Sequence, residues 1–384
     1  MAFSNKRAAL LIAGALLLAV AACGGNGTVP SSPPAAGNAA QQVYGADSNF
    51  ASPADDTSIL KKLTKDVVIG STVDPTNGDT GPHAISVVKT NFVLKKGQVV
   101  VCNFADKSGS AGKGTTIDVL DPQPSSKPTT FAQSTEAEGC DGDAITSGNG
   151  VFAAGFTSGV LAAFSNKGKL GKTYGSPLEE PFSDVDAANP NLYAAEYIFS
   201  SDASTGGIVS FSINNYGNNK PLQVGAGFDV NKKSGWSALG PSGLQYDKKH
   251  DTLYITDGVD DNVVAFTHAS ELLVQDEIVV EDGGKSFKCK YPQTTCGKLI
   301  FSGSPLKAPV AMALLSNGNL IVANTKGGNT LVEISAAGQV LDTKVVDKSK
   351  TAGIFGLAAT GSNDNNTALY YTDTNTNTLH KLEQ

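Results

Sequence analysis

The sequence predicts an all-β fold, a six-bladed β-propeller of four-stranded antiparallel blades that is closed by an N-terminal strand. A group of short apolar strands and tight polar turns recurs six times at a spacing of roughly 40–70 residues, and such a unit cannot bury its apolar face alone. Stacking six units around an axis gives a propeller. The 42 glycines suit the many turns, and no long amphipathic helical pattern is present. Because the repeats span most of the 384 residues, they indicate one domain where length alone would allow two or three.

The second strand of each repeat is the easiest to recognise. It is a short apolar run, and a tight polar turn and a third apolar strand follow it. We therefore use these strands to count the blades. The six segments are GQVVVCNF from Gly97, NGVFAAGF from Asn149, PNLYAAEY from Pro190, DTLYITDG from Asp251, NGNLIVAN from Asn317 and NTALYYTD from Asn366.

The last repeat ends at Gln384, directly after its third strand, whereas earlier repeats have residues left for a fourth. The best example of a fourth strand is GQVLDTKVVD at Gly338–Asp347, and the similar segment KDVVIGSTVD at Lys65–Asp74 precedes the first repeat. An open ring would expose strand edges and one unpacked blade. We therefore predict that Lys65–Asp74 supplies the missing outer strand of the last blade.

The N-terminus carries an export signal. Lys6 and Arg7 precede an apolar region, Ala8–Ala19, that is short for a membrane span. The following Val-Ala-Ala-Cys resembles a bacterial lipobox, which implies a lipoprotein signal peptide over residues 1–22 and acylation of Cys23, for example with palmitate. The alternative is an ordinary signal peptide with a chance cysteine. Residues 23–57 are rich in Gly, Pro, Ala and Ser, so we expect a disordered tether ahead of a propeller domain at 58–384.

This leader predicts a location in the bacterial cell envelope, with a lipid anchor as the contact with the membrane. Gly24 and Gly25 follow the cysteine, and in Gram-negative lipoproteins this resemblance favours the outer membrane, facing the periplasm or the surface. A Gram-positive source would place the anchor in the single membrane. Without Lys6 and Arg7 the mature chain has 27 basic and 36 acidic residues, a net charge of −9. This charge argues against a nucleic-acid partner.

Four cysteines remain when Cys23 carries lipid, and an even number in an oxidising compartment predicts two disulfides. Cys289 and Cys296 bracket a short loop. Cys102 ends one second strand and Cys140 precedes the next inner strand, so a bridge between blades is feasible. Free thiols are the alternative, whereas a zinc site would need closer cysteine spacing and histidine partners.

Two insertions interrupt the repeat spacing. One runs from about residue 214 to 240 and contains the only tryptophan, Trp236. The other runs from about residue 270 to 307 and contains the Cys289–Cys296 pair. Extra length in a repeat array maps to loops that often form a binding face, although a loop without a partner is the alternative.

The fullest repeat, Gly240–Phe266, resembles an NHL-type repeat: Pro-x-Gly, an apolar strand, Asp, Leu-Tyr, a polar turn and a further apolar strand. The units from Ala308 and Ile354 are similar to it, and the segment that starts at Gly81 has the opening residues of the same pattern. The resemblance covers roughly residues 65–384 and implies the six-bladed propeller of the gluconolactonase and NHL-like proteins. It says little about chemistry, since such a fold hosts many functions.

Enzymes with this propeller place their sites in the central channel, and few of their residues recur here. Gluconolactonases and the senescence marker protein family hold a divalent metal there, with a Glu before the Gly-Pro opening of one inner strand and an Asn from another among its ligands. At the position of the Glu this chain has Thr80, and at the position of the Asn it has Ser242. The amidating lyases use three channel histidines. Of the four histidines here only His83 falls on an inner strand, and Pro82-His83-Ala84 resembles the opening of virginiamycin B lyase-like proteins. We therefore expect no metal and no cofactor, with a channel-bound calcium ion as the open alternative.

Aligning the inner strands predicts which residues reach the channel. Two acids, a histidine and a serine there could bind a polar ligand or transfer protons, although polar residues line a wet channel in any propeller. Val310 and Phe355 occupy the opposite arc. The predicted channel-lining residues are His83, Asp143, Ser183, Asp184 and Ser242.

Two functions follow from these observations. The first is a lipid-anchored, non-catalytic binding or scaffold protein for a protein or saccharide partner. The second is a hydrolase or lyase of the gluconolactonase or virginiamycin B lyase-like type, using His83 with Asp143 or Asp184 on a small lactone or sugar acid. No nucleotide-binding loop, nucleophile elbow or haem-attachment motif is present in the sequence.

Overall fold

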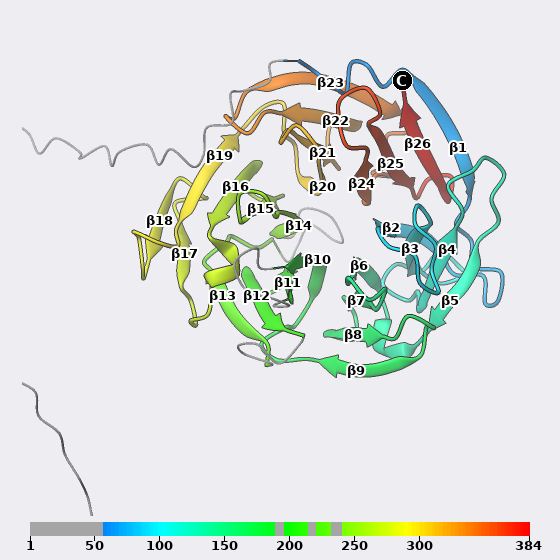
Figure 1. Ribbon diagram of the computed structural model, residues 1–384, viewed down its shortest axis with the longest axis horizontal. Helices are drawn as coiled ribbons and strands as arrows, with labels where there is room; N and C mark the ends of the chain where they lie inside the picture. Colours follow the sequence, from blue (N-terminus) through cyan, green and yellow to red (C-terminus); the bar gives the residue numbers. More distant parts are fainter. Residues whose placement is uncertain (1–56, 189–195, 214–219, 232–239) are drawn as a thin grey trace, which may run out of the picture. The chain divides into compact units, whose positions relative to one another are not determined.

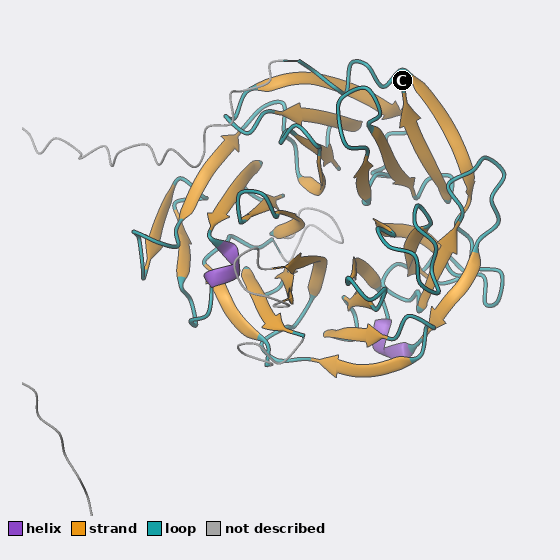
Figure 2. Ribbon diagram, in the orientation of Figure 1, coloured by secondary structure: helices purple, strands orange, loops and turns teal. Residues whose placement is uncertain are grey.

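The described strands form six sheets arranged around a central axis (Figure 1), and every strand pair is antiparallel except one. The structure is a computed structural model that describes residues 57–188, 196–213, 220–231 and 240–384. All of these lie in one compact unit, Asp47–Gln384. Apart from two short 3-10 helices, Thr135–Ala137 and Ala269–Glu271, the regular elements are strands (Figure 2). The predicted six-bladed propeller is confirmed.

The first two blades follow the predicted order, with the innermost strand first in sequence. Each blade runs outward from the axis through three hairpin connections. The first blade contains β2 (Thr80–Val87), β3 (Val99–Ala105), β4 (Thr116–Leu120) and β5 (Thr129–Gln133). The second blade contains β6 (Cys140–Ile145), β7 (Val151–Gly155), β8 (Val160–Phe164) and β9 (Leu170–Tyr174).

The third blade is larger than predicted. Its inner four strands are β10 (Pro181–Ala188), β11 (Glu196–Asp202), β12 (Gly207–Ser212) and β13 (Leu222–Ala226). The second insertion adds a hairpin, β17 (Ile278–Glu281) and β18 (Ser286–Cys289), and β17 pairs parallel to β13. This insertion belongs in sequence to the fourth blade, so it joins the third and fourth blades through backbone hydrogen bonds.

The second strand of this third blade also differs from the prediction. The sequence analysis placed it at Pro190–Tyr197, whereas β11 begins at Glu196. The apolar run that pairs with β10 is Tyr197–Phe199, with Tyr197 opposite Ala187. Burial of these side chains in the core therefore fixes the register of β11 against β10. Residues 189–195 lie outside the described part of the chain.

The remaining blades keep four strands each. The fourth contains β14 (Pro241–Asp247), β15 (Thr252–Asp257), β16 (Asn262–Thr267) and β19 (Gly297–Ser302). The fifth contains β20 (Pro309–Leu314), β21 (Leu320–Asn324), β22 (Asn329–Ile334) and β23 (Val340–Asp347). The sixth contains β24 (Leu357–Thr360), β25 (Ala368–Asp373), β26 (Thr378–Glu383) and the N-terminal β1 (Lys65–Ser71).

The N-terminal closure is confirmed. β1 pairs antiparallel with β26, from Lys65 opposite Glu383 to Ser71 opposite Thr378 (Figure 1). The turn before β1 is held by the fifth blade, because the buried Glu333 carboxylate accepts hydrogen bonds from the Ile59 and Leu60 amides at 3.1 and 2.8 Å. The start and the end of the described chain thus meet in one sheet.

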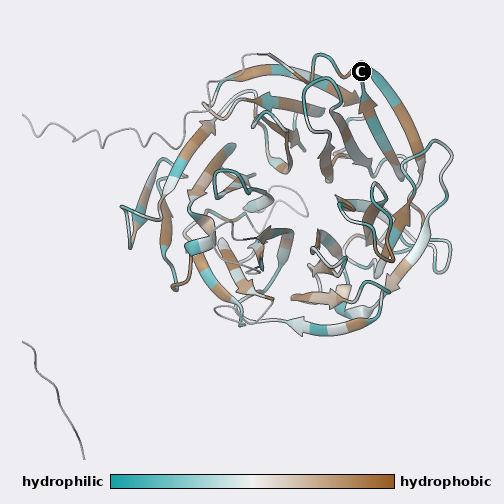
Figure 3. Ribbon diagram, viewed as in Figure 1, coloured by the Kyte–Doolittle hydropathy of each residue, from teal (hydrophilic) through white to brown (hydrophobic). Residues whose placement is uncertain are grey.

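Apolar side chains fill the space between adjacent blades. Hydrophobic stretches recur in the strands around the ring (Figure 3). Because each blade is covered on both faces, its second strand is buried throughout, as in β3 and β15. One cluster packs the first blade on the second through Val100, Cys102 and Val151, and similar clusters fill the other interfaces. Burial on both faces explains why these strands read as continuous apolar runs.

Both predicted disulfides are present in the structure. Cys102 of β3 bonds to Cys140 at the start of β6, and so links the first and second blades. Cys289, the last residue of β18, bonds to Cys296 and closes the short loop that follows the hairpin.

Several predictions concern residues outside the described chain. The signal peptide at 1–22, Cys23, nearly all of the tether at 23–57 and Trp236 belong to this group, so they stay predictions. In the described part, no helix has the length and apolar character needed to span a bilayer.

Candidate functional site

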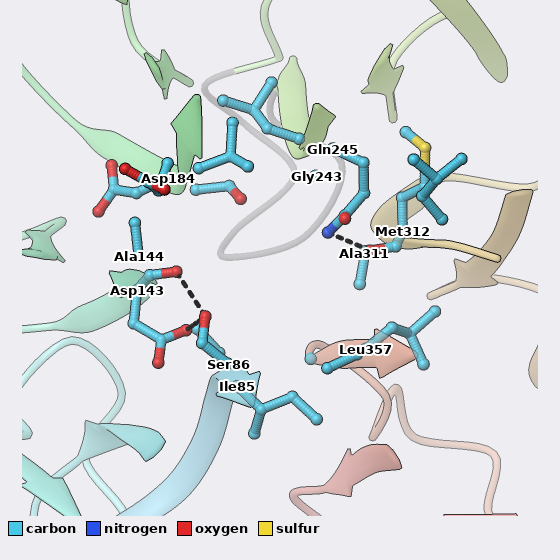
Figure 4. Close-up of a pocket in the computed structure, with 18 of the residues that line it drawn as sticks. Ile85, Ser86, Asp143, Ala144, Asp184, Gly243, Gln245, Ala311, Met312 and Leu357 are labelled. Atoms are coloured by element: carbon cyan, nitrogen blue, oxygen red, sulfur yellow. Dashed lines mark hydrogen bonds between the residues drawn. The ribbon is translucent and has the colours of Figure 1, made fainter. Parts of the chain in front are cut away.

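The inner strands of all six blades line a cavity of about 270 Å³ on the propeller axis (Figure 4). β2, β6, β10, β14, β20 and β24 each contribute lining residues, and the lining extends past the end of β2 to Lys89. Residues distant in sequence therefore share one small volume, which is where propellers commonly bind ligands.

A β-bulge near the start of the inner strands decides which side chains face this cavity. The pairing of β2 with β3 shifts between Pro82 and Ala84, and that of β6 with β7 shifts between Cys140 and Gly142. The extra residue at these bulges is His83 in the first blade and Asp141 in the second. A bulge adds one residue to a strand and changes the face on which the following side chains lie.

His83 does not line the cavity. Its ring stacks between Phe104 and Phe355, with centroid distances of 4.0 and 4.1 Å, and only 5% of the residue is exposed. The Nδ1 atom lies 2.7 Å from the Asp141 Oδ1 atom. Phe156 packs edge-on against Phe104, so His83 lies in a group of buried aromatic rings.

Ser242 is also buried outside the cavity lining. Its hydroxyl lies 3.2 Å from the carbonyl oxygen of Pro309 in the next blade and 3.1 Å from the Thr256 hydroxyl. These contacts tie the fourth blade to the fifth. Ser183 does line the cavity, and its backbone N–H donates to the Ser201 hydroxyl at 3.1 Å.

The structure brings Asp143 and Asp184 together on one wall of the cavity (Figure 4). Their strands are adjacent because Gly142 has no side chain: a Cβ atom there would lie 2.7 Å from the Ser183 Cα atom. The Ser86 hydroxyl donates to the Asp143 Oδ1 atom at 3.1 Å. Asp143 Oδ2 and both carboxylate oxygens of Asp184 have no hydrogen-bond partner, and each residue is 5% exposed.

Burial raises the pKa of these carboxyl groups. It raises the pKa of Asp184 to about 7; the charge of Asp141 adds to the rise, and the nearby Ser200 hydroxyl and Ala154 backbone amide partly offset it. It also raises the pKa of Asp143 well above the usual range, helped by the charge of Asp184. Asp186, which also lines the cavity, has a pKa of about 8 through burial and the charge of Glu196. Near neutral pH the carboxyl groups of this wall are therefore partly protonated.

The facing wall is apolar. Val310 lies on this wall as the sequence analysis predicted, as does Phe355, which also covers His83. The one polar contact drawn on this side is the Gln245 side-chain amide, which donates to the Met312 carbonyl oxygen at 3.0 Å (Figure 4). The larger apolar residues of this wall are Val310, Met312, Leu314, Phe355 and Leu357.

Among the described residues, no three His, Cys, Asp or Glu side chains are grouped so that they could hold a metal ion.

Sequence analysis missed several polar lining residues, among them Asp141, Asp186 and Gln245. Asp141 was missed because the second repeat was aligned on Gly142 and has Cys140 where the other repeats have proline. Pro82, Pro181, Pro241 and Pro309 each precede a bulge, so an alignment on this position would have paired His83 with Asp141. Asp186 alternates with Asp184 along β10, so strand periodicity could have found it.

No family model and no curated protein matches the chain. A gluconolactonase from Xanthomonas campestris is 11% identical over 79% of this chain and 86% of its own, with a TM-score of 0.51. A protein of unknown function from Bacteroides thetaiotaomicron is 12% identical over 82% of this chain and 74% of its own, also at 0.51. A virginiamycin B lyase from Staphylococcus aureus is 15% identical over 83% of this chain and 85% of its own, at 0.47. At these identities the likeness shows the propeller fold alone.

Proposed function

We propose that this protein is a non-catalytic binding protein of the bacterial cell envelope, anchored through a lipid on Cys23, whose central channel binds a small ligand. The observation that carries the proposal is the cavity of about 270 Å³ with buried, unpartnered carboxylate oxygens in its wall. Buried polar atoms are normally hydrogen-bonded, so orphaned ones in a cavity favour a bound partner. A protein or saccharide partner would present one end group to this cavity.

The channel part of the proposal is tested by filling the cavity. A fragment library containing neutral, anionic and cationic compounds is screened by thermal shift against the full chain, and hits are measured by calorimetry. Ala359→Trp places a large side chain on the channel wall and should abolish the binding of every hit. Ala337→Trp, in the exposed turn after β22, is the matched control. Hits that bind Ala359→Trp as tightly as the wild type would contradict a channel site.

The anchor is tested separately in bacteria. Cys23→Ala should move the protein from the membrane fraction to the soluble fraction, and mass spectrometry of the wild type should detect acyl chains on Cys23. An unchanged distribution, together with an unmodified Cys23, would reject the lipid anchor and leave the channel proposal intact.

A second candidate is the hydrolase or lyase, because a carboxyl group with a pKa near 7 suits proton transfer. In this candidate Asp184 and Asp143 would touch the substrate, whereas His83 would act through Asp141. Turnover of a lactone or sugar acid should then fall by about 10²-fold or more in Asp184→Asn. Equal rates in the wild type and Asp184→Asn would remove this candidate.

A further inference from the structure

The two walls of the channel differ in a way that selects the chemistry of a ligand. The wall from β6 and β10 carries carboxyl groups, and the wall from β20 and β24 is apolar (Figure 4). Resting on the proposed channel function, we propose that the ligand is an amphipathic organic cation, a protonated amine carried on an apolar body.

The acidic wall needs a partner that donates several hydrogen bonds. Both oxygens of Asp184 and the Oδ2 atom of Asp143 lack a partner, although these side chains are about nineteen-twentieths buried. A carboxylate only accepts hydrogen bonds, and an ammonium group offers three donors and a positive charge. A hydroxyl group would supply one donor and no charge. The ammonium group therefore fits this wall best.

The apolar wall selects the rest of the ligand. Met312 and Leu357 are at most 4% exposed, and their side chains present no donor or acceptor to the cavity apart from a weakly accepting thioether. A saccharide carries hydroxyl groups on every side, and those facing this wall would lose their hydrogen bonds to water. A hydrocarbon body gains free energy on the same surface. The arrangement thus favours an amine with an apolar body over a sugar.

The cavity volume limits the size of this body. An apolar cavity of about 150 Å³ accommodates benzene. The channel cavity of about 270 Å³ therefore has room for one ring and a short alkyl chain. Such a chain would let the ring lie against the wall of β20 and β24 while the amine reaches Asp184.

Protonation of the acidic wall competes with the cation. Because the pKa of Asp184 is about 7, a bound ammonium should lower this pKa and release a proton near neutral pH. Affinity for the amine should therefore rise with pH through that range. The other titratable or charged groups around this wall are Asp141 and Asp143 on β6, His83 on β2, Lys89 after β2, Asp186 on β10, Glu196 on β11, Tyr246 on β14 and Lys248 after β14.

Calorimetry with three matched compounds tests the proposal on the full-length chain. The probes are 4-phenylbutylamine, 4-phenylbutanol and 4-phenylbutyrate, which share a body and differ in the charge of one end group. At pH 8 we expect the amine to bind about 10- to 100-fold more tightly than the alcohol, as a charged hydrogen-bonded pair allows. The carboxylate should bind weakest of the three.

Asp184→Asn keeps the side-chain volume and removes the charge. It should bring the affinity of the amine within about threefold of that of the alcohol, whereas Asp282→Asn in the exposed β17–β18 turn should change neither. The wild type provides a readout that needs no mutation. At pH 7 the binding of the amine should release protons, and the binding of the alcohol should release none. Measuring the binding enthalpy in buffers of different ionisation enthalpy gives the number of protons released.

Two results would overturn the inference, and they separate it from the proposed function. If the alcohol binds as tightly as the amine and Ala359→Trp blocks both, the ligand is not selected by charge, but the channel still binds ligands. If neither probe binds, the amine class is rejected, and the fragment library then decides whether the channel binds anything.

Discussion

The channel wall built by the second and third blades and the wall built by the fifth and sixth blades have opposite chemistry. The first carries Asp143 and Asp184 with orphaned oxygens, and the second carries Met312 and Leu357. They are also secured differently. The Cys102–Cys140 disulfide fixes the edge of the acidic side, whereas the turn before β1 and Glu333 secure the apolar side. The comparison teaches that the inner strands of one kind of repeat can carry acidic residues on one side of the ring and apolar residues on the other, while the order of strands from the axis outward stays the same.

The largest expected effect is on the apolar side. Glu333 is fully buried and accepts hydrogen bonds from the Ser58 hydroxyl, the Asn319 amide and two backbone amides. Glu333→Ala leaves these donors unpaired, and we expect the free energy of unfolding in urea to fall by about 3–5 kcal/mol. Glu281→Ala, which breaks only an exposed pair with Lys288, is the control and should cost less than about 1 kcal/mol. A similar small loss in both variants would show that the N-terminal turn does not secure the ring.

The next effect is on the edge of the acidic side. The Cys102–Cys140 bond closes a loop with a sequence separation of 38, and that of Cys289–Cys296 is 7. Loop-closure entropy then predicts a loss of about 3–4 kcal/mol for Cys102→Ala with Cys140→Ala, against about 2 kcal/mol for the Cys289→Ala, Cys296→Ala pair. Urea unfolding measures both. A larger loss for the Cys289→Ala, Cys296→Ala pair would contradict the loop-closure argument. It would mean that the β17–β18 hairpin stabilises the contact between the third and fourth blades more than the Cys102–Cys140 bond stabilises the contact between the first and second.

A smaller effect should appear as a pH dependence of the acidic wall. The folded state holds the Asp184 proton up to a pKa of about 7, whereas a free aspartate loses it near 4. This proton stabilises the fold at low pH, and its contribution is lost as the pH rises through about 7. Between pH 5 and 8 the wild type should therefore lose roughly 2–3 kcal/mol more stability than Asp184→Asn.

Asp282→Asn serves as the matched control and should keep the wild-type slope. A wild-type stability that is flat between pH 5 and 8, or an Asp184→Asn variant with the same slope as the wild type, would contradict a raised pKa at Asp184.

The smallest effect concerns the spacing of the acidic strands. Gly142→Ala would press a methyl group on the backbone of β10, and we expect a loss of about 1–3 kcal/mol in unfolding free energy. Gly171→Ala on the outer strand β9 meets its nearest atom only at 3.4 Å and is the control. If both variants are equally stable, the strands can move apart, and the closeness of Asp143 and Asp184 is not fixed by this glycine.

Much of the architecture was predictable because it depends on local patterns. Repeated apolar strands gave the number of blades, and the short last repeat gave the closing role of β1. The site was predicted less completely. Asp143, Ser183 and Asp184 line the cavity, whereas His83 and Ser242 are buried outside its lining. The second strand of the third blade, β11, begins at Glu196, later than the predicted start at Pro190, and its buried residues Tyr197–Phe199 pair with β10.

The sequence by itself determined the propeller and its closure, because strand periodicity and turn residues are local patterns. It made two disulfides the expected outcome, and the tertiary structure decided their pairing. Only the tertiary structure decided that carboxyl groups face hydrocarbon across the channel. The side-chain period of a strand is two, and a bulge near the start of five of the six inner strands changes the face on which the following side chains lie. The two walls are built by strands from four different blades, and their juxtaposition exists only when the ring is closed.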